Sequence, residues 1–339
     1  KALLAHINKY ELPDSDDGAG VVAIDTVSRD LFAIAQRVAQ TDATVLLTGE
    51  SGVGKEVVAR FIHRQSARRN GPFVAINCAA IPDSLLEATL FGYEKGAFTG
   101  AQQAQAGKFE QAQDGTLLLD EVTEMPMGLQ AKLLRVLQER EVERVGGKKP
   151  VALNIRIVAT SNRDMAEAVA KGVFREDLYY RLNVFPVAIP PLRDRPLDIV
   201  PIARYFLVEH GGRFGRSGVG FGAQAEQALL RHTWPGNVRE LENVIQRALI
   251  LSTGPEIGGE HLNLASAPGR ESPKVVAEMP VHESDKKVDN MKDLEREHIL
   301  RTLAEVDGSR KMAIERLGIS ERTLRYKLQQ YRDEGYFKD

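Results

Sequence analysis

The sequence is poor in cysteine, and Cys78 is the only one among its 339 residues. A single thiol excludes an internal disulfide and a metal cluster held by cysteines. Cys78 ends the apolar stretch 74–78, a pattern that predicts a buried strand. Because buried cysteines are usually inert, we interpret it as part of the core rather than as a reactive group.

Long apolar runs and a strong net charge are also missing. No apolar run approaches the roughly 18 residues that a membrane-spanning helix needs, and nothing resembles a signal peptide, so we expect a cytoplasmic protein without a membrane partner. The net charge is only −2, so a nucleic-acid site must depend on a local cluster of basic residues. With 43% hydrophobic and 27% charged residues, the composition is typical of a globular protein.

A glycine-rich loop lies between an apolar run at 44–47 and a helical pattern that begins near residue 57. Glycines allow backbone N–H groups to turn toward phosphate oxygens, and the following helix N-terminus favours negative charge. Lys55 would reach the β- and γ-phosphates, whereas Glu56 stands where the usual pattern has Ser or Thr for Mg²⁺. The predicted ATP-binding loop consists of Gly49, Glu50, Ser51, Gly52, Val53, Gly54, Lys55 and Glu56.

The departure at Glu56 requires a second site, and residues 115–121 supply one. This apolar strand ends in two carboxylates, as a Walker B strand does. Asp120 would organise Mg²⁺, and Glu121 would orient or activate the attacking water. A buried strand followed by a solvated acidic turn is an equally good interpretation of this segment alone. The glycine loop in the same domain favours the nucleotide site.

Strands and helices alternate along the first part of the chain, which predicts an α/β domain with a mostly parallel sheet covered on both faces. The strands are expected at 44–47, 73–77, 116–119, 155–160 and 184–189. A helical lid, a flexible linker rich in proline and charge, and a separate all-α domain are expected to follow. The expected divisions are a linker or domain remnant at 1–20, the α/β part at 21–190, the lid at 191–264, the flexible linker at 265–290 and the C-terminal domain at 291–339.

Several stretches resemble the bacterial enhancer-binding proteins, the AAA+ activators of sigma-54 RNA polymerase that are related to the nitrogen regulator NtrC. The Gly-Ala-Phe-Thr-Gly-Ala stretch is the most specific, because other AAA+ groups lack it, and Glu56 is usual in this family. The resemblance covers residues 21–262 and is carried by 49–56, 94–101, 115–121, 174–182 and 234–241. The segment 23–31 is similar to the flagellar FleR/FlrC branch, and 318–325 to a Fis-type helix-turn-helix.

The resemblance implies further residues at the ATP site. Asn77 would hold Glu121 until the correct nucleotide is bound. Ser161 and Asn162 would form sensor I, and Arg239 would be the sensor II arginine of the lid.

Two arginines are implied to act between subunits. Arg175 and Arg181 would be arginine fingers that reach the ATP of a neighbour in a hexameric or heptameric ring. A guanidinium suits this task because it answers the charge on the transferring phosphoryl group without losing its proton. The alternative is that both are surface charges beside Glu176 and Asp177.

The same resemblance implies that a glycine-flanked loop contacts sigma-54. Two glycines around a lone aromatic, Phe98, are not typical of a core segment, although a turn with Phe98 tucked inward is the alternative. A second loop at 143–150 would support the first. The implied contact residues are Gly96, Ala97, Phe98, Thr99, Gly100 and Ala101.

The C-terminal segment carries the local basic cluster that DNA binding needs. Between positions 310 and 332 there are seven basic and two acidic residues. A helix-turn-helix places such residues on phosphates and base edges, whereas a solvated helical hairpin is the alternative. Apolar residues at 294, 299, 300 and 303 would pair two such domains as a dimer. The candidate contacts to double-stranded DNA are Arg310, Lys311, Ser320, Arg322, Thr323, Arg325, Tyr326 and Lys327.

Together these features predict an ATP-hydrolysing, two-component transcription activator of flagellar genes, preceded by a receiver domain whose last helix would end before residue 14. Another AAA+ machine, such as a helicase loader or unfoldase, predicts no Gly-Ala-Phe-Thr-Gly-Ala loop. A DNA-bound repressor or scaffold that binds nucleotide without turnover predicts a damaged Walker B strand or missing fingers. Neither expectation matches the sequence.

Overall fold

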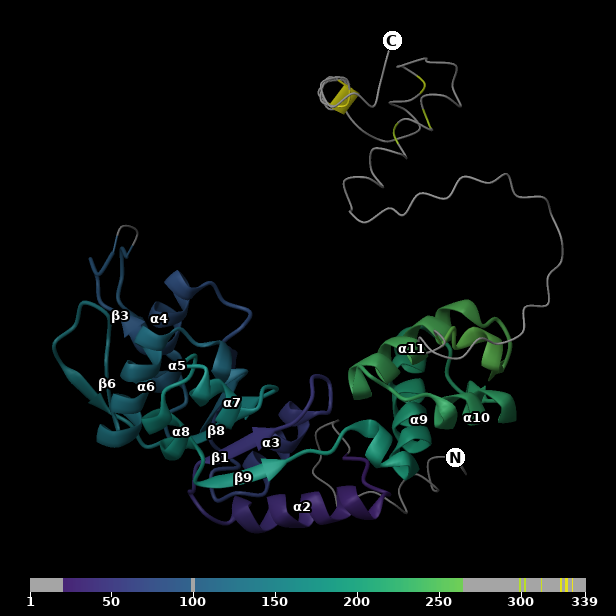
Figure 1. Cartoon of the computed structure of the whole chain (residues 1–339), viewed down its shortest axis with the longest axis horizontal. Helices are drawn as coiled ribbons and strands as arrows, with labels where there is room; N and C mark the ends of the chain where they lie inside the picture. The colour runs from purple at the N-terminus through teal and green to yellow at the C-terminus, as the bar shows by residue number, and fades with distance from the viewer. Residues whose placement is uncertain are drawn as a thin grey trace. The chain divides into compact units, whose positions relative to one another are not determined.

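The computed structural model describes residues 21–98 and 101–264, and seven single positions in the C-terminal segment. The chain divides into two units, Lys1–Arg270 and Glu271–Asp339. The first contains a five-stranded parallel sheet in the order β2-β5-β8-β1-β9, which confirms the predicted α/β class (Figure 1). Its strands are β1 (Val45–Thr48), β2 (Phe73–Asn77), β5 (Thr116–Asp120), β8 (Arg156–Ser161) and β9 (Phe185–Ala188).

The central strand β5 is apolar because both of its faces are covered. Alternate side chains point to opposite faces of a sheet, so Leu117 and Leu119 pack into one core and Leu118 into another. Helices α4 (Asp83–Phe91), α6 (Met127–Glu139) and α8 (Glu176–Leu182) contribute to the first core. The second core is built with α2 (Thr26–Ala39) and α3 (Lys55–Arg64). Shorter elements on this unit are α5 (Lys108–Gln111), the 3₁₀ turn η1 (Val122–Glu124) and α7 (Met165–Ala170).

A helical lid follows β9 through the 3₁₀ turn η2 (Leu192–Asp194). Its core closes around Trp234, which is fully buried and donates its indole N–H to the Leu229 carbonyl at 2.9 Å. The lid elements are α9 (Pro196–Arg213), β10 (Gly220–Phe221), α10 (Ala223–Arg231), α11 (Asn237–Leu251), β11 (Glu256–Ile257) and the 3₁₀ turn η3 (Gly259–His261).

Two short hairpins project from the α/β part on the side away from the lid (Figure 1). The first pairs β3 (Gly92–Tyr93) with β4 (Gln105–Ala106), and the second pairs β6 (Glu141–Glu143) with β7 (Pro150–Ala152). A bridge between Tyr93 and Val145 joins them, and the Glu94 N–H donates to the Val145 carbonyl at 3.0 Å. The two hairpins are therefore anchored to each other at their bases.

The C-terminal unit is described at seven positions, all of them helical: Ile299, Thr302, Met312, Leu324, Lys327, Leu328 and Tyr331. Leu324, Leu328 and Tyr331 are buried, and their spacing places them on one face of a helix. Residues 1–20 and 265–298 lie outside the described residues, as do positions 300 and 303 of the expected dimer face. Among the described residues, no helix is long and apolar enough to cross a membrane.

The two-sided burial of β5 predicts a large stability loss from a single truncation. Leu118 is 1% exposed, and we expect Leu118→Ala to lower the free energy of unfolding by about 2–5 kcal/mol, because it leaves a cavity. Leu85→Ala is the control, since Leu85 is 55% exposed on α4. Urea unfolding of both variants checks this, and equal losses would contradict the assigned core.

Candidate active site

The glycine-rich loop connects β1 to α3 in backbone conformations that favour glycine. Gly49, Gly52 and Gly54 have φ values of 151°, 77° and 99°. A Cβ on Gly49 would lie 2.7 Å from the Ile189 carbonyl oxygen, so there is no room for a side chain. The loop ends where α3 begins at Lys55, and the free N–H groups of that first helical turn favour an anion.

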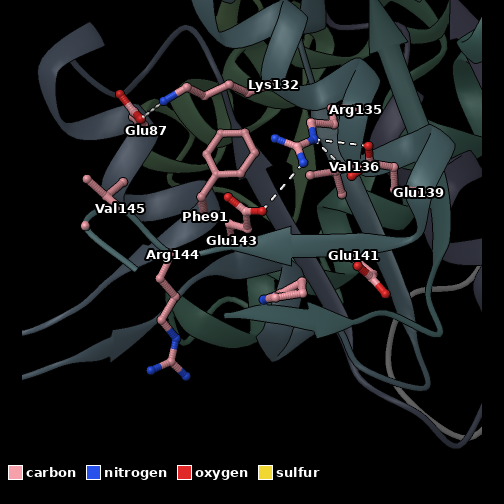
Figure 2. Close-up of a pocket in the computed structure, with 12 residues that line it drawn as sticks. Glu87, Phe91, Lys132, Arg135, Val136, Glu139, Glu141, Glu143, Arg144 and Val145 are labelled. Atoms are coloured by element: carbon pink, nitrogen blue, oxygen red, sulfur yellow. Dashed lines mark hydrogen bonds and ion pairs between the residues drawn. The ribbon is translucent and has the colours of Figure 1, made fainter. Parts of the chain in front are cut away.

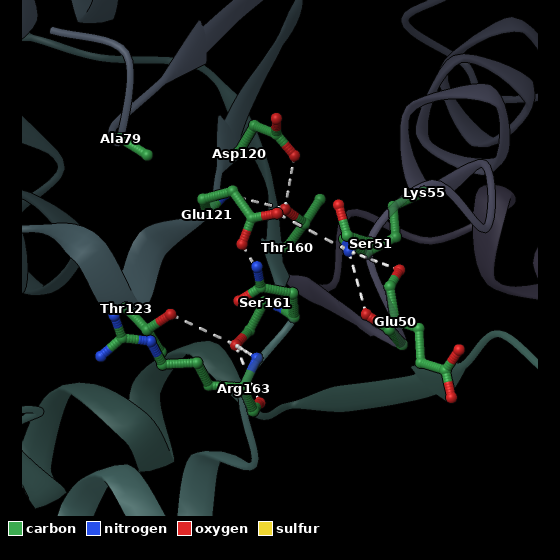
Figure 3. Close-up of polar contacts among 12 residues, drawn as sticks. Glu50, Ser51, Lys55, Ala79, Asp120, Glu121, Thr123, Thr160, Ser161 and Arg163 are labelled. Atoms are coloured by element: carbon green, nitrogen blue, oxygen red, sulfur yellow. Dashed lines mark hydrogen bonds and ion pairs between the residues drawn. The ribbon is translucent and has the colours of Figure 1, made fainter. Parts of the chain in front are cut away.

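Lys55 lies across this loop as a buried cation, 7% exposed. Its Nζ donates to the carbonyl oxygens of Gly49 at 2.9 Å and Glu50 at 3.1 Å, and lies 3.8 Å from Glu121 Oε1 (Figure 3). Burial lowers the pKa of Lys55, and the nearby carboxylates of Glu121 and Asp120 oppose that shift. The fold thus brings the predicted phosphate-binding lysine to the predicted water-activating carboxylate.

The two acidic residues at the end of β5 are held by Thr160 of β8, Asp120 through its carboxylate and Glu121 through its backbone N–H (Figure 3). Its Oγ1 donates to Asp120 Oδ1 at 2.6 Å and accepts from the Glu121 N–H at 2.9 Å. Sequence reasoning missed Thr160. The sequence places Thr160 near the end of an apolar strand, but its contact with Asp120 and Glu121 depends on β8 lying beside β5 in the sheet.

Asn77 corrects one expectation. Its Nδ2 donates to Asp120 Oδ2 at 2.9 Å, not to Glu121. The parallel register pairs Asn77 with Asp120, so their side chains lie on the same face of the sheet. Glu121 leaves the strand with φ 54° and lies toward Lys55 instead.

The two expected sensor I residues differ in their contacts. The backbone N–H of Asn162 donates to Glu121 Oε2 at 3.3 Å. Ser161 is fully buried, and its Oγ donates to the Arg163 carbonyl at 2.9 Å and accepts from the Arg163 N–H at 3.1 Å. Of these two residues, Asn162 thus contacts the carboxylate pair through its backbone, whereas the Ser161 hydroxyl bonds to Arg163.

The lid contributes a charged wall to this site. Arg239 Nη1 donates to Ser51 Oγ at 2.9 Å, which brings the predicted sensor II arginine to the loop. Arg193 donates to both carboxylate oxygens of Glu50, at 2.9 and 2.6 Å. Hydrogen bonds from Arg193 and Asn237 lower the pKa of Glu50 to about 2, so this carboxylate is charged at neutral pH.

Two cavities flank the loop. A cavity of about 530 Å³ lies between Ser51, Asn162 and Arg239, where polar phosphates would fit. A second cavity, of about 220 Å³, is lined mainly by apolar side chains, and a flat base would fit there. Sequence reasoning missed this second cavity, because its lining comes from distant parts of the chain, including Val22, Phe32, Ile189, Ile202, Tyr205 and Val238.

The two predicted arginine fingers lie at α8. Arg175 precedes the helix and donates to both oxygens of Asp177, at 2.9 and 2.6 Å, as the surface-charge interpretation expects. Arg181 donates to the Leu137 carbonyl at 2.8 Å. Among residues 21–98 and 101–264, no hydrogen bond or ion pair joins either arginine to Lys55 or Glu121. A role at an ATP site would therefore be in another subunit, and it stays a prediction.

The loop around Phe98 stands on the first hairpin. Phe98 is 44% exposed, and its ring contacts Tyr93 at a centroid distance of 4.9 Å. The Gly96 N–H donates to the Ala101 carbonyl at 2.9 Å, and the Ala101 N–H donates to the Phe98 carbonyl at 3.0 Å. Phe98 is thus not a core residue, whereas Thr99 and Gly100 lie outside the described residues.

The second hairpin lies directly against the first. A Cβ on Gly146 would lie 3.0 Å from the Ala97 Cβ, and Arg144 donates to Glu94 at 3.2 Å and to Glu110 at 2.7 Å. A charged cleft lies beside them, where Lys132 pairs with Glu87 and Arg135 with Glu139 and Glu143 (Figure 2). The expected support of the first loop by the second has a physical basis in these contacts.

Of the predicted DNA contacts, the structure describes Lys327, which is helical and half-buried. The other seven lie outside the described residues: Arg310, Lys311, Ser320, Arg322, Thr323, Arg325 and Tyr326.

Comparison with known proteins accounts for nearly the whole chain. Residues 21–188 match the sigma-54 interaction domain, 193–278 the AAA+ ATPase lid domain, and 290–331 the Fis family of bacterial regulatory proteins. The response regulator protein FleR of Pseudomonas aeruginosa is 54% identical, over 99% of this chain and 75% of that protein. The transcriptional regulatory protein FlbD of Caulobacter vibrioides is 48% identical, over 95% of this chain and 72% of that protein.

A solved structure extends the likeness to the fold. NtrX from Brucella abortus in complex with ADP has a TM-score of 0.68 and 33% sequence identity, and the match covers 97% of this chain and 72% of that one. NtrX in complex with ATP gives a TM-score of 0.67.

The position of Lys55 predicts how a truncation changes nucleotide binding. We expect Lys55→Ala to weaken binding of a fluorescent ATP analogue roughly tenfold to hundredfold, because a hydrogen bond to a charged group is worth about 1.5–3 kcal/mol. Lys171→Ala is the control, since the Lys171 side chain is 66% exposed and pairs with Glu167 along its own helix. Unchanged affinity in Lys55→Ala would remove Lys55 from the binding site.

Proposed function

The chain belongs to the NtrC-like family of sigma-54-dependent AAA+ transcription activators, and on that premise we propose that it hydrolyses ATP within a ring to open promoter complexes of sigma-54 RNA polymerase. The observation that carries this proposal is the exposed Phe98 on a hairpin in the same unit as the Lys55–Glu121 pair. ATP chemistry and a surface for a partner protein are thus present on one α/β scaffold.

The residues at the loop fit the steps of phosphoryl transfer to water. The loop backbone and Lys55 would bind the phosphates, with the base in the apolar cavity. Glu121 would accept the proton of the attacking water. Thr160 would help to orient Glu121, because its hydroxyl oxygen accepts a hydrogen bond from the Glu121 backbone N–H. A proposed role for Asn77 is to orient Asp120 rather than Glu121.

The donor set at the end of β5 also fits Mg²⁺. This ion prefers oxygen ligands and is usually bound by one or two carboxylates together with substrate phosphates. Asp120 offers such a carboxylate, oriented by Thr160 and Asn77. When bound, Mg²⁺ neutralises charge on the phosphates.

The fingers imply a site shared between subunits. If Arg175 and Arg181 stabilise charge on the ATP of a neighbour, each active site is completed only at an interface, and turnover requires ring assembly. We assign ATP binding to residues 21–264, and DNA binding and dimerisation to 291–339. The chain would act in the cytoplasm, where promoter DNA and polymerase are found.

Regulation follows from the same family. The similarity of this chain to the response regulator protein FleR supports the proposal that it is part of a two-component system. We propose flagellar genes as its target. A nucleotide-binding, DNA-bound repressor or scaffold without turnover is the weaker proposal, because Lys55 lies 3.8 Å from Glu121 and near the Asp120 carboxylate, as ATP hydrolysis would require.

A shared site can be tested by mixing two inactive variants. Arg181→Ala lacks a finger, and Glu121→Gln lacks the proton acceptor. At some interfaces of a mixed ring, the first variant supplies an intact Glu121 and the second an intact Arg181, so part of the ATP turnover should be recovered. Turnover is measured at concentrations where rings assemble and exchange subunits.

The control mixes Glu121→Gln with Lys55→Ala. Both changes affect the same half of the site, so no mixed interface is intact and no recovery is expected. If exchanging rings of the first pair also fail to recover, the fingers do not act between subunits.

The coupling role of Phe98 predicts a separation of activities. Phe98→Ala should keep most ATPase activity and DNA binding, because the residue lies on a hairpin outside the ATP site. It should lose sigma-54 binding in the presence of a transition-state analogue, and open-complex formation at a sigma-54 promoter. An exposed aromatic side chain that becomes buried in a complex often carries much of the binding energy.

Phe214→Ala is the matched control, since Phe214 is 47% exposed on the lid. Normal transcription activation by Phe98→Ala would sink the activator proposal at its most specific residue.

A further inference from the structure

The lid contacts the phosphate-binding loop at four consecutive residues. Each contact is a hydrogen bond from the lid or the turn that leads to it. Glu50 accepts from Arg193 and Asn237, Ser51 from Asn237 and Arg239, Gly52 from the N–H groups of Val238 and Arg239, and Val53 from Arg195. This loop is therefore one of the contacts that hold the lid in position.

Asn237 joins three segments at this interface. It is fully buried, with φ 52°, at the first position of α11. Its Oδ1 accepts from the Leu192 N–H at 2.8 Å, while Nδ2 donates to Glu50 Oε2 at 3.0 Å and to the Ser51 carbonyl at 3.1 Å. Both amide protons are used, so the two donors of this side chain are directed at the loop.

Glu50 links the same interface to Lys55. Its carbonyl oxygen accepts from Lys55 Nζ at 3.1 Å, while its carboxylate accepts from Asn237. The contact is also tight, because a Cβ on Gly52 would lie 2.5 Å from the Gly236 carbonyl oxygen and 3.0 Å from Arg239 Cβ. The Glu50 backbone carbonyl is therefore hydrogen-bonded to Lys55, and the Glu50 carboxylate is hydrogen-bonded to the lid.

We propose that Asn237 is a positioning residue, which fixes the lid on the loop through Glu50 and thereby sets where Arg239 faces the nucleotide cavity. This inference rests on the proposed function of the loop as the ATP site. It differs from a cap role for Asn237, in which the amide would only stabilise the start of α11 and Glu50 would be irrelevant.

Asn237→Asp tests the contact by changing one atom. The variant keeps an oxygen for the Leu192 N–H and places a carboxylate against Glu50, and two adjacent carboxylates repel. We expect hydrogen exchange at the Val238 and Arg239 amides, which donate to Gly52, to quicken by about tenfold or more, with a similar loss of affinity for a fluorescent ATP analogue.

Asn263→Asp is the matched control. Asn263 also lies in the lid with a positive φ, 43°, but it is exposed. The same chemical change there should leave both readouts at the wild-type value. Exchange in α9 reports whether the lid itself stays folded.

Rescue separates positioning from capping. In Asn237→Asp combined with Glu50→Gln, the new amide can donate to the new carboxylate, so exchange and affinity should return at least partly toward wild type. If the double variant exchanges as fast as Asn237→Asp, or if Asn237→Asp exchanges like wild type, the proposal is overturned.

Gly52→Ala changes the loop side of the same contact, because the added Cβ would lie too close to Gly236 and Arg239, and it replaces Asn237→Asp if that variant does not fold. It should also speed exchange at Val238 and Arg239, and wild-type exchange there would count against the proposal. Failure of the wild-type protein to bind ATP would instead refute the proposed function, because the exchange measurements need no nucleotide.

Discussion

The buried ammonium group of Lys55 is the constraint around which the site is built. A buried cation is costly unless it is paired and hydrogen-bonded. Two loop carbonyls supply the hydrogen bonds, and Glu121 supplies the opposite charge 3.8 Å away. The pair can form because β8 lies between β1 and β5 and holds both Walker B residues through Thr160. Phosphates that entered this loop would meet a cation that donates to two carbonyl oxygens and lies near the carboxylates of Glu121 and Asp120.

The two projecting hairpins follow, along the chain, the two strands that end at the ATP site: β2, which carries Asn77, and β5, which carries Asp120. Strand β2 ends at Asn77, and the chain continues through α4 into β3, beneath Phe98. Strand β5 ends at Asp120, and the chain continues through η1 and α6 into β6. Asn77 and Asp120 are hydrogen-bonded at one end of these routes, and the Tyr93–Val145 bridge joins the other end. The two routes are thus joined to each other at both ends, so the hairpins are connected to the carboxylates by more than a single flexible link.

The sequence predicts well what is local in it. All five predicted strands are present, displaced by at most one residue, because each is a compact apolar run between turns. The glycine loop and the Asp120–Glu121 pair are likewise continuous stretches. The contacts of Thr160, Asn77 and Asn237 could not be predicted, since each depends on strand order, register or lid docking between distant segments. The apolar cavity could not be predicted for the same reason, because its lining residues are apolar in the sequence but come from distant segments that only the fold brings together.

The contacts that Arg175 and Arg181 make within one chain bear on the proposal that both act as arginine fingers in a ring. The Arg175–Asp177 pair is between side chains that are 38% and 47% exposed. Such exposed pairs gain little in water, lose side-chain entropy and are screened by salt. Arg181 donates to the Leu137 carbonyl oxygen. A phosphate group carries more charge than either partner and presents oxygens to a planar guanidinium, so it would compete well for both arginines. The surface contacts in one chain are therefore compatible with the proposed release of both arginines toward a neighbour, whereas buried ion pairs at the same positions would have opposed it.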